Sequence, residues 1–146
     1  MRIVCPLLFL GLLVSPVLTG CGDGRPRRVP VSGRVLIDGE PLSHGTIMLV
    51  PHDARPSTAP LDAQGRFTMN CFDEGDGAVL GTHRVGVSAV KPLSGSSQQW
   101  LAPKRYVDYN DSGLEVEITG PTDDLKIELT WDGGRPFVET FQYEGY

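Results

Sequence analysis

Residues 125–131 are Leu-Lys-Ile-Glu-Leu-Thr-Trp, in which apolar and polar side chains alternate without interruption. Successive side chains of a β-strand point to opposite faces, so a period of two predicts a strand with one buried and one solvated face. Residues 114–118, Leu-Glu-Val-Glu-Ile, alternate in the same way, and Gly-Pro-Thr-Asp-Asp at residues 120–124 is typical of a turn. This part of the chain therefore predicts two half-buried strands joined by a turn.

The same period extends upstream to residue 29. The apolar positions that would share a strand face are Val29, Val31, Val35 and Ile37, then Phe67, Met69 and Cys71, then Val85, Val87 and Ala89. Residues 46–50 are an apolar run typical of a central strand, and residues 38–39 and 62–65 have turn compositions. Gly33 predicts a bulge or a close backbone approach. Six or seven short strands without helical periodicity predict an all-β antiparallel sandwich.

Two segments interrupt this pattern. Residues 91–111 form a long irregular stretch, and loops of that length in compact domains are usually functional or mobile. Residues 132–146 begin with Asp-Gly-Gly, which could fold residues 137–143 into a C-terminal hairpin strand. The same tail could instead be an ordered arm, and the sequence leaves this choice open.

The first twenty residues have the pattern of a secretory signal. Arg2 precedes an apolar core that contains prolines and falls short of the roughly 18–20 uninterrupted residues of a membrane span. Leu18-Thr-Gly-Cys21 resembles the bacterial lipobox, whose cysteine is acylated on sulfur before the signal is removed. This resemblance implies a lipoprotein signal peptide over residues 1–20 and lipid attachment at Cys21. The alternatives are an uncleaved signal anchor and a cysteine that stands at position 21 by chance.

Lipid attachment would place the protein on the cell envelope. Residues 21–28 would then form a flexible lipid-anchored tether between the bilayer and the folded domain. Where a cell has two membranes, the uncharged Gly22 resembles the pattern that directs lipoproteins to the outer membrane. The alternative location in such a cell is the periplasmic face. Arg25, Arg27 and Arg28 in the tether could contact anionic headgroups or could simply be solvated.

Composition limits the partners of the remaining 126 residues, which suffice for one domain. The signal contains one of the 13 Lys and Arg residues and none of the 18 Asp and Glu residues, so the rest carries a net charge of −6. We therefore expect no nucleic-acid partner. Cys5 lies in the signal and Cys21 would carry lipid, which leaves Cys71 without a partner for an intramolecular disulfide.

Five motifs together resemble a known family. They are Gly33-Arg-Val35, Asp38-Gly-Glu-Pro-Leu42, Gly45-Thr-Ile47, Asp62-Ala-Gln-Gly-Arg-Phe67 and Gly81-Thr-His-Arg-Val-Gly-Val87. In order and spacing they are similar to the carboxypeptidase regulatory-like domain, especially as it occurs in small bacterial lipoproteins. The resemblance covers residues 29–131 and implies a seven-stranded antiparallel Greek-key β-sandwich of the transthyretin or prealbumin type, without peptidase residues. His83 departs from the pattern, which more often has an aromatic residue there, and so does the extension over 132–146.

Candidate site residues are few. Trp100, Tyr106 and Tyr109 in the 91–111 loop are the best candidates for contact with a sugar or a peptide, although Trp100 and Tyr106 could instead cover an open end of the sandwich. The three histidines, His44, His52 and His83, lack the spacing of a metal-ligand motif, so we expect neither a metal nor a cofactor. Cys71 shares a strand face with Phe67 and Met69 and is expected to be buried rather than nucleophilic.

No set of acid, base and nucleophile can be assembled, so the sequence favours a protein that is not an enzyme. The expected function is that of a lipid-anchored cell-envelope protein, a structural or interaction module that contacts the membrane through Cys21. The alternative is a carbohydrate- or peptide-binding module that uses the 91–111 loop. An envelope protein or a glycan is the expected partner.

Overall fold

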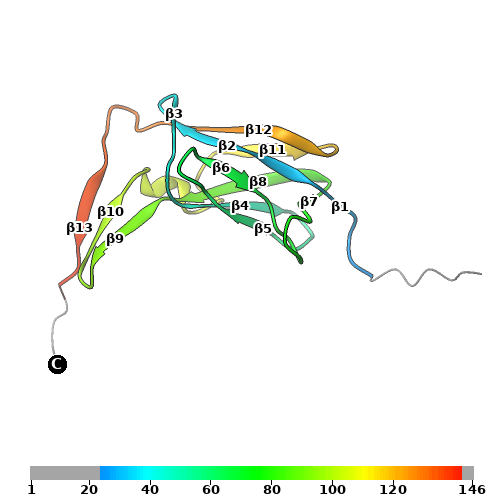
Figure 1. Ribbon diagram of the computed structural model, residues 1–146, viewed down its shortest axis with the longest axis horizontal. Coiled ribbons are helices and arrows are strands. Elements are labelled where there is room, and N and C mark those ends of the chain that lie inside the picture. The colour runs from blue at the N-terminus through cyan, green and yellow to red at the C-terminus, as the bar shows by residue number, and fades with distance from the viewer. Residues whose placement is uncertain (1–23, 143–146) are drawn as a thin grey trace, which may run out of the picture.

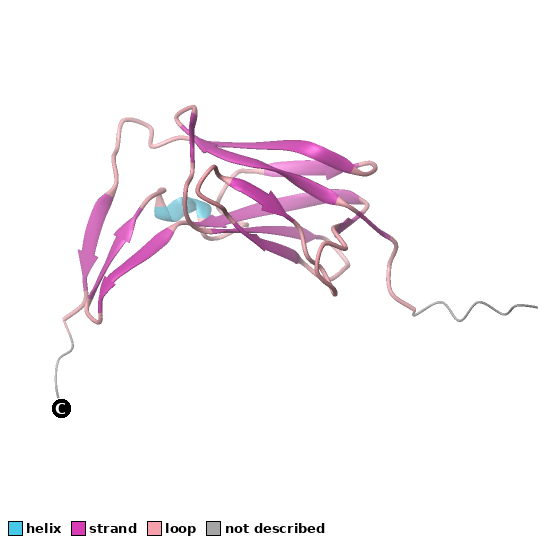
Figure 2. Cartoon of the chain, viewed as in Figure 1, coloured by secondary structure: helices cyan, strands magenta, loops and turns pink. Residues whose placement is uncertain are grey.

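The computed structural model describes residues 24–142 and is all-β (Figures 1 and 2). The strands in chain order are β1 (Arg28–Val29), β2 (Val31–Ile37), β3 (Glu40–Pro41), β4 (Thr46–Pro51), β5 (Ser57–Pro60), β6 (Arg66–Thr68), β7 (Ala78–Val79), β8 (Gly81–Ser88), β9 (Val90–Ser94), β10 (Ser97–Trp100), β11 (Glu115–Ile118), β12 (Thr122–Leu129) and β13 (Phe137–Thr140). A single-turn 3₁₀ helix, η1 (Lys104–Tyr106), precedes β11. The predicted all-β sandwich is confirmed.

Two sheets form the sandwich. One has the strand order β11-β8-β4-β5 and is antiparallel throughout, with Ile47 of β4 opposite Val87 of β8. The other has β2 at its centre, flanked by β12 on one side and by β3 and β6 on the other. The two sheets face each other across the core (Figure 1).

One pair departs from the predicted antiparallel arrangement, because β12 runs parallel to β2, with Ile127 opposite Val35. The physical reason is that the predicted turn near residue 120 does not close a hairpin. It carries the chain from β11 in one sheet to β12 in the other, so β12 enters beside β2 in the same direction. Gly33 lies at this contact, where an added Cβ would sit 1.9 Å from the Leu125 carbonyl oxygen, which confirms the predicted close approach.

The core is built from the strand faces predicted by the period of two. Val31, Val35, Ile47, Met69 and Val85 are at most 1% exposed, and they come from both sheets. Burial of each such side chain stabilises the fold by about 1.5–3 kcal/mol relative to exposure. The sandwich therefore stands on packing without a disulfide among the described residues, and Cys71 is buried as predicted.

The prediction of an irregular loop over 91–111 is wrong, because this segment begins with a hairpin of β9 and β10 and continues through η1. The C-terminal segment does form a strand, β13, but β13 pairs with β10 and not with the preceding strand. We call the three-stranded sheet β9-β10-β13 the arm sheet. It projects from one end of the sandwich, at the left of Figure 1.

The N-terminal segment lies at the opposite end of the molecule (Figure 1). There β1 pairs with β7, with Val29 opposite Ala78. The predicted tether extends to Arg28, yet Arg28 is the first residue of β1 and is half-buried. The folded domain therefore begins within the last residues assigned to the tether.

Candidate functional site

The three aromatic residues proposed from sequence do not form an open platform. Tyr106 is 4% exposed and Trp100 is 9% exposed, while Tyr109 is half-buried with the Arg84 guanidinium 5.0 Å from its ring centroid. The Tyr106 hydroxyl accepts a hydrogen bond from the Thr130 backbone N–H at 3.1 Å. The two most buried rings thus pack where the 91–111 segment meets the end of β12.

The arm sheet presents two faces with different chemistry. Residues directly opposite each other in an antiparallel pair lie on the same face. Trp100 is opposite Phe137 and Gln98 is opposite Glu139, so these four share one face, and Val138 lies on the other. The first face is partly polar, whereas Val138 exposes an apolar side chain.

The Glu139 carboxylate is the polar centre of the first face. Its Oε2 accepts hydrogen bonds from Gln98 Nε2 at 3.0 Å and Trp100 Nε1 at 2.8 Å, and its Oε1 pairs with the Lys104 ammonium. The hydrogen bond from Lys104, followed by those from Trp100 and Gln98, lowers the pKa of Glu139 to about 2. The ionised carboxylate therefore links β10, β13 and η1.

Three rings join the arm sheet to the sandwich. Trp100 and Phe137 stack with centroids 6.3 Å apart, and Trp131, which follows β12, meets Phe137 edge-on at 6.4 Å. Lys104 Nζ lies 5.1 Å from the Trp100 ring centroid, within the range of a cation–π contact. These contacts fix the first face of the arm sheet against the end of β12.

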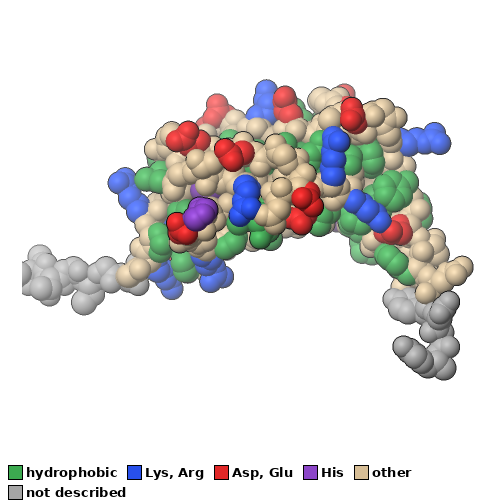
Figure 3. Space-filling view, turned by 180° about the vertical axis from the view of Figure 1, so that it is seen from behind, with side chains coloured by type: hydrophobic (Ala, Val, Ile, Leu, Met, Phe, Trp, Pro, Cys, Tyr) green, Lys and Arg blue, Asp and Glu red, His purple; other side chains and the backbone are tan. Residues whose placement is uncertain are grey.

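The arm sheet also holds most of the large hydrophobic side chains that the described residues expose. Six such side chains are at least 41% exposed, and four of them, Leu93, Phe137, Val138 and Phe141, lie in or directly beside the arm sheet. Hydrophobic side chains gather over this end in the space-filling view (Figure 3). Exposed large apolar side chains gathered at one end of a molecule make that end a candidate interaction site.

Sequence reasoning missed this set of residues. The Asp-Gly-Gly turn at residues 132–134 predicted a strand over 137–143, but nothing in the sequence indicated that its partner would be β10, about 40 positions upstream. No pattern in the sequence indicated a role for Glu139. Its hydrogen-bond donors Gln98, Trp100 and Lys104 become its neighbours only after β10 pairs with β13.

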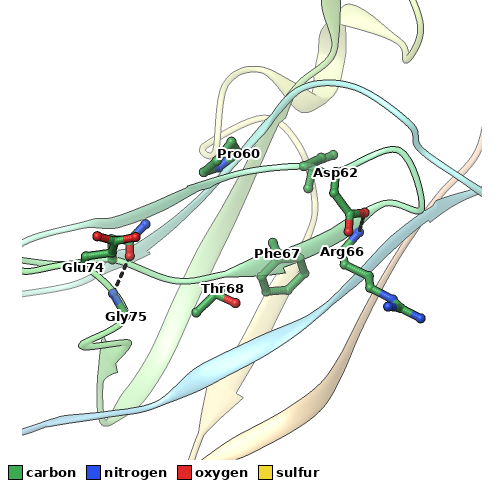
Figure 4. A pocket seen from close by; sticks show the side chains of 9 residues that line it. Pro60, Asp62, Arg66, Phe67, Thr68, Glu74 and Gly75 are labelled. Carbon is green, nitrogen blue, oxygen red and sulfur yellow. Dashed lines mark hydrogen bonds between the residues drawn. The ribbon is translucent and has the colours of Figure 1, made fainter.

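An open groove of about 630 Å³ lies along β5 and β6 (Figure 4). Asp62 and Glu74 lie toward its opposite ends. The Asp62 carboxylate already accepts the backbone N–H groups of Gln64 and Arg66, each at 2.8 Å, and so closes the turn before β6. Its carboxylate is therefore engaged in the turn, and the groove presents no assembled set of reactive groups.

The histidines are dispersed, each with its own local partner. His83 is fully buried, and its Nε2–H donates to the Val79 carbonyl at 2.8 Å, so the imidazole fills a core position. His44 bonds to the Val90 carbonyl, and His52 lies 2.7 Å from Asp53. Within residues 24–142 no group of three or more His, Cys, Asp or Glu side chains could hold a metal ion.

A second cluster lies at the N-terminal end. The guanidinium centres of Arg25, Arg28 and Arg55 lie 4.8, 4.9 and 5.0 Å from the Phe72 ring centroid. Arg28 Nε also lies 2.8 Å from an oxygen of Asp76, and both side chains are largely covered.

Asp76 anchors the turn that carries Phe72. Burial raises its pKa, but hydrogen bonds from the backbone N–H groups of Cys71, Phe72 and Asp73, with the Arg28 charge, outweigh burial and hold the pKa below its ordinary value. Asp76 is therefore an ionised, fixed partner of Arg28. This cluster joins three distant parts of the chain.

Cys21 and the predicted signal of residues 1–20 lie outside the described residues, as do residues 143–146. Within the described part, no helix has the length and apolar character needed to cross a membrane. Comparison of the chain with models of known protein families gives no match, and neither does comparison with curated proteins or with solved structures. The similarity to the carboxypeptidase regulatory-like domain stays a prediction from sequence motifs.

Proposed function

We propose that this chain is a non-enzymatic, lipid-anchored protein of the cell envelope whose β-sandwich carries the arm sheet as an interaction surface. The observation that carries the proposal is the placement of the two ends. The described N-terminal segment and the arm sheet lie at opposite ends of the long axis (Figure 1). A lipid on Cys21, three residues before the first described residue, would therefore present the arm sheet away from the bilayer.

The exposed side chains of the arm sheet support an interaction role. Phe137 and Val138 are 41% and 55% exposed, although neighbouring Trp100 is nearly covered. Exposed aromatic and aliphatic side chains beside a polar network are typical of surfaces that contact other proteins. An envelope protein is the partner class that fits this surface best.

The absence of an enzymatic role is part of the proposal, and the dispersal of reactive groups supports it. Cys71 is buried, with its Sγ near the Arg55 carbonyl oxygen at 3.6 Å. His52 is exposed and paired with Asp53, far in sequence from Cys71. General acid–base or nucleophilic catalysis requires such groups within hydrogen-bonding distance.

Lipid attachment is tested by metabolic labelling with a fatty acid. The wild-type protein should incorporate label and sediment with membranes, and the Cys21→Ser variant should lose both properties. Cys71→Ala is the matched control, since it removes the other cysteine that would remain after signal removal and should keep the label. Wild-type labelling of the Cys21→Ser variant would overturn lipid anchoring.

The interaction surface is tested by crosslinking in intact cells. A photoreactive residue replaces Thr140, an exposed residue of β13, and in a parallel strain it replaces Glu128, an exposed residue of the sandwich. A discrete adduct should form from position 140 and not from position 128. No adduct from position 140, or the same adduct from both positions, would overturn this role of the arm sheet.

The alternative function, carbohydrate or peptide binding by the 91–111 segment, is favoured in its peptide form. Trp100 and Tyr106 are too covered to stack on a sugar. A peptide would add instead to the outer edge of β13, which pairs with β10 of the 91–111 segment and has no second partner strand among the described residues. An extended peptide can add to such an edge through main-chain hydrogen bonds. Peptide binding would slow amide hydrogen exchange in β13, which a glycan held by side chains would leave unchanged.

A further inference from the structure

We propose that the arginine cluster at the N-terminal end, Arg25, Arg27, Arg28 and Arg55, is a contact surface for a bilayer that contains anionic phospholipids. The inference rests on the proposed lipid anchor for its biological setting, since the anchor would bring this end of the domain to the bilayer. It adds a second, electrostatic membrane contact that fixes how the anchored domain stands on the surface.

Three of the four arginines, Arg25, Arg28 and Arg55, are held in place by contacts with the folded domain. Arg25 and Arg28 from the N-terminal segment and Arg55 from the segment between β4 and β5 place their guanidinium groups about Phe72, each about 5 Å from the ring centroid. Phe72 itself is held by its backbone N–H, which donates to Asp76 at 3.1 Å. Because these three guanidinium groups are already positioned, their binding to phosphate groups would cost less side-chain entropy than binding by a mobile basic segment.

The acidic residues at this end do not neutralise the whole cluster. Asp76 is engaged by Arg28, and Asp73 pairs with Arg25 at 3.0 Å. Asp53, which lines the same groove as Arg27, lies 2.7 Å from His52. Within residues 24–142, neither Arg27 nor Arg55 has a carboxylate partner, and both are exposed. These two side chains are therefore the ones most available to lipid phosphates.

An apolar side chain lies beside the exposed cations. Leu80, 41% exposed, lines the same open groove as Pro26 and Arg27. A basic side chain next to an exposed leucine is the combination found in segments that lie at the headgroup boundary of a membrane. In the space-filling view, Lys and Arg side chains lie close to the point where the N-terminal trace leaves the domain (Figure 3).

Chain length sets how close the cluster would be to an anchored bilayer. Cys21 precedes Arg25 by four residues, which span at most about 14 Å when fully extended. The Debye length is about 10 Å at 0.1 M salt, so Arg25 would lie within the range of the surface charge when the intervening residues are not fully extended. Distant carboxylates, which give the chain its negative net charge, would be largely screened from it.

The test uses a single synthetic acyl chain, because one chain gives only marginal, reversible membrane binding and so reveals a second contribution. A C14 maleimide is coupled to Cys21 of a chain of residues 21–146 that carries Cys71→Ala. Every strand that the structure describes lies between Arg28 and Thr140, so this chain keeps the described fold. Partitioning onto neutral phosphatidylcholine vesicles is compared with partitioning onto vesicles containing 30% phosphatidylglycerol, at 0.1 M salt.

The decisive variant is Arg27→Gln/Arg55→Gln. Each basic residue near an anionic surface contributes about fivefold in partitioning, so the double variant should bind the anionic vesicles about 25-fold less and the neutral vesicles equally. The matched control, Lys91→Gln/Arg135→Gln, removes the same charge from exposed positions at the arm end and should bind as the parent does.

Two results would overturn the proposal: equal partitioning of the parent onto neutral and anionic vesicles, or an equal loss in the double variant and the control. Neither result would test lipid attachment at Cys21, because fatty-acid labelling of Cys21 is measured separately in cells. Conversely, failure of Cys21 labelling would leave the vesicle result standing as a property of the domain.

Discussion

The sandwich and the arm sheet are both made of short strands, yet they bury their side chains very differently. In β8, Val85 and Val87 are 0% and 1% exposed, because the facing sheet covers them. In β13, Phe137 and Val138 are 41% and 55% exposed. The same kinds of apolar residue therefore stabilise the fold in one region and remain on the surface in the other.

The difference shows that the two regions depend on different forces. The sandwich gains most from apolar burial, whereas the arm sheet depends on strand pairing, the Glu139 hydrogen bonds and the rings around Phe137. Regions with few buried apolar contacts open at lower free energy than the core. We therefore expect the arm sheet to open before the sandwich unfolds.

The largest effect should come from Tyr106→Ala, at the junction of the two regions. Tyr106 is 4% exposed and belongs to the core cluster, so deletion of its ring should lower the free energy of unfolding by about 3–5 kcal/mol. Urea denaturation measures the change. Tyr106→Phe keeps the ring and removes only the hydroxyl that accepts the Thr130 N–H, so it should cost about 1–3 kcal/mol. An unchanged stability of Tyr106→Ala would mean that this residue does not join arm and sandwich.

A smaller but sharper contrast comes from two glycines. In Gly33→Ala the new Cβ would lie 1.9 Å from the Leu125 carbonyl oxygen, so β2 and β12 must separate, at a cost of about 1–3 kcal/mol. Gly95 in the arm hairpin has nothing within 4 Å of such a Cβ, so Gly95→Ala should be nearly neutral. Thermal unfolding of both variants measures this difference in stability. An equal loss of stability in Gly33→Ala and Gly95→Ala would contradict the prediction.

The same contrast explains which parts of the fold were predictable. Residues 114–118 and 125–131 alternate because one face is buried, and their strands were predicted correctly. In β9, by comparison, four of five residues are exposed, so no periodic pattern is required and none is present. A strand that is held by pairing alone leaves little trace in its own sequence.

Candidate site residues were predictable to a similar extent. Burial of Cys71 followed from its place on a strand face with Phe67 and Met69. The network around Glu139 did not, because it depends on pairing between β10 and β13. The contacts of Phe72 likewise depend on a tertiary meeting of residues 25, 28 and 55.

Acid should open the arm sheet selectively. The pKa of Glu139 is lowered in the folded protein to about 2 from 4.5, so its stabilising contribution is complete above pH 4.5 and is lost as the pH falls toward and through about 2. Both tryptophans of the chain, Trp100 and Trp131, adjoin Phe137, so their fluorescence reports on this region. We expect a fluorescence change over that pH range, while far-ultraviolet circular dichroism retains the sandwich signal.

Glu139→Gln provides the control for the acid transition. The amide keeps the shape of the side chain but does not titrate, so the variant should show the opened fluorescence at neutral pH and little change on acidification. A wild-type transition that survives in Glu139→Gln would assign it to other carboxylates and would remove Glu139 from the account of arm stability.

The smallest effect on stability should come from Val138→Asp, and this variant distinguishes a surface kept for a partner from one kept for folding. Val138 is 55% exposed, so the change should alter the free energy of unfolding by no more than about 0.5 kcal/mol. The same variant should abolish the adduct formed from a photoreactive residue at position 140, because a charge on the docking face would be buried without a partner. If Val138→Asp instead lowered the free energy of unfolding by about 2 kcal/mol or more, that face of β13 would be packed within the molecule. The arm sheet would then extend the core, and this face would not be available to a partner.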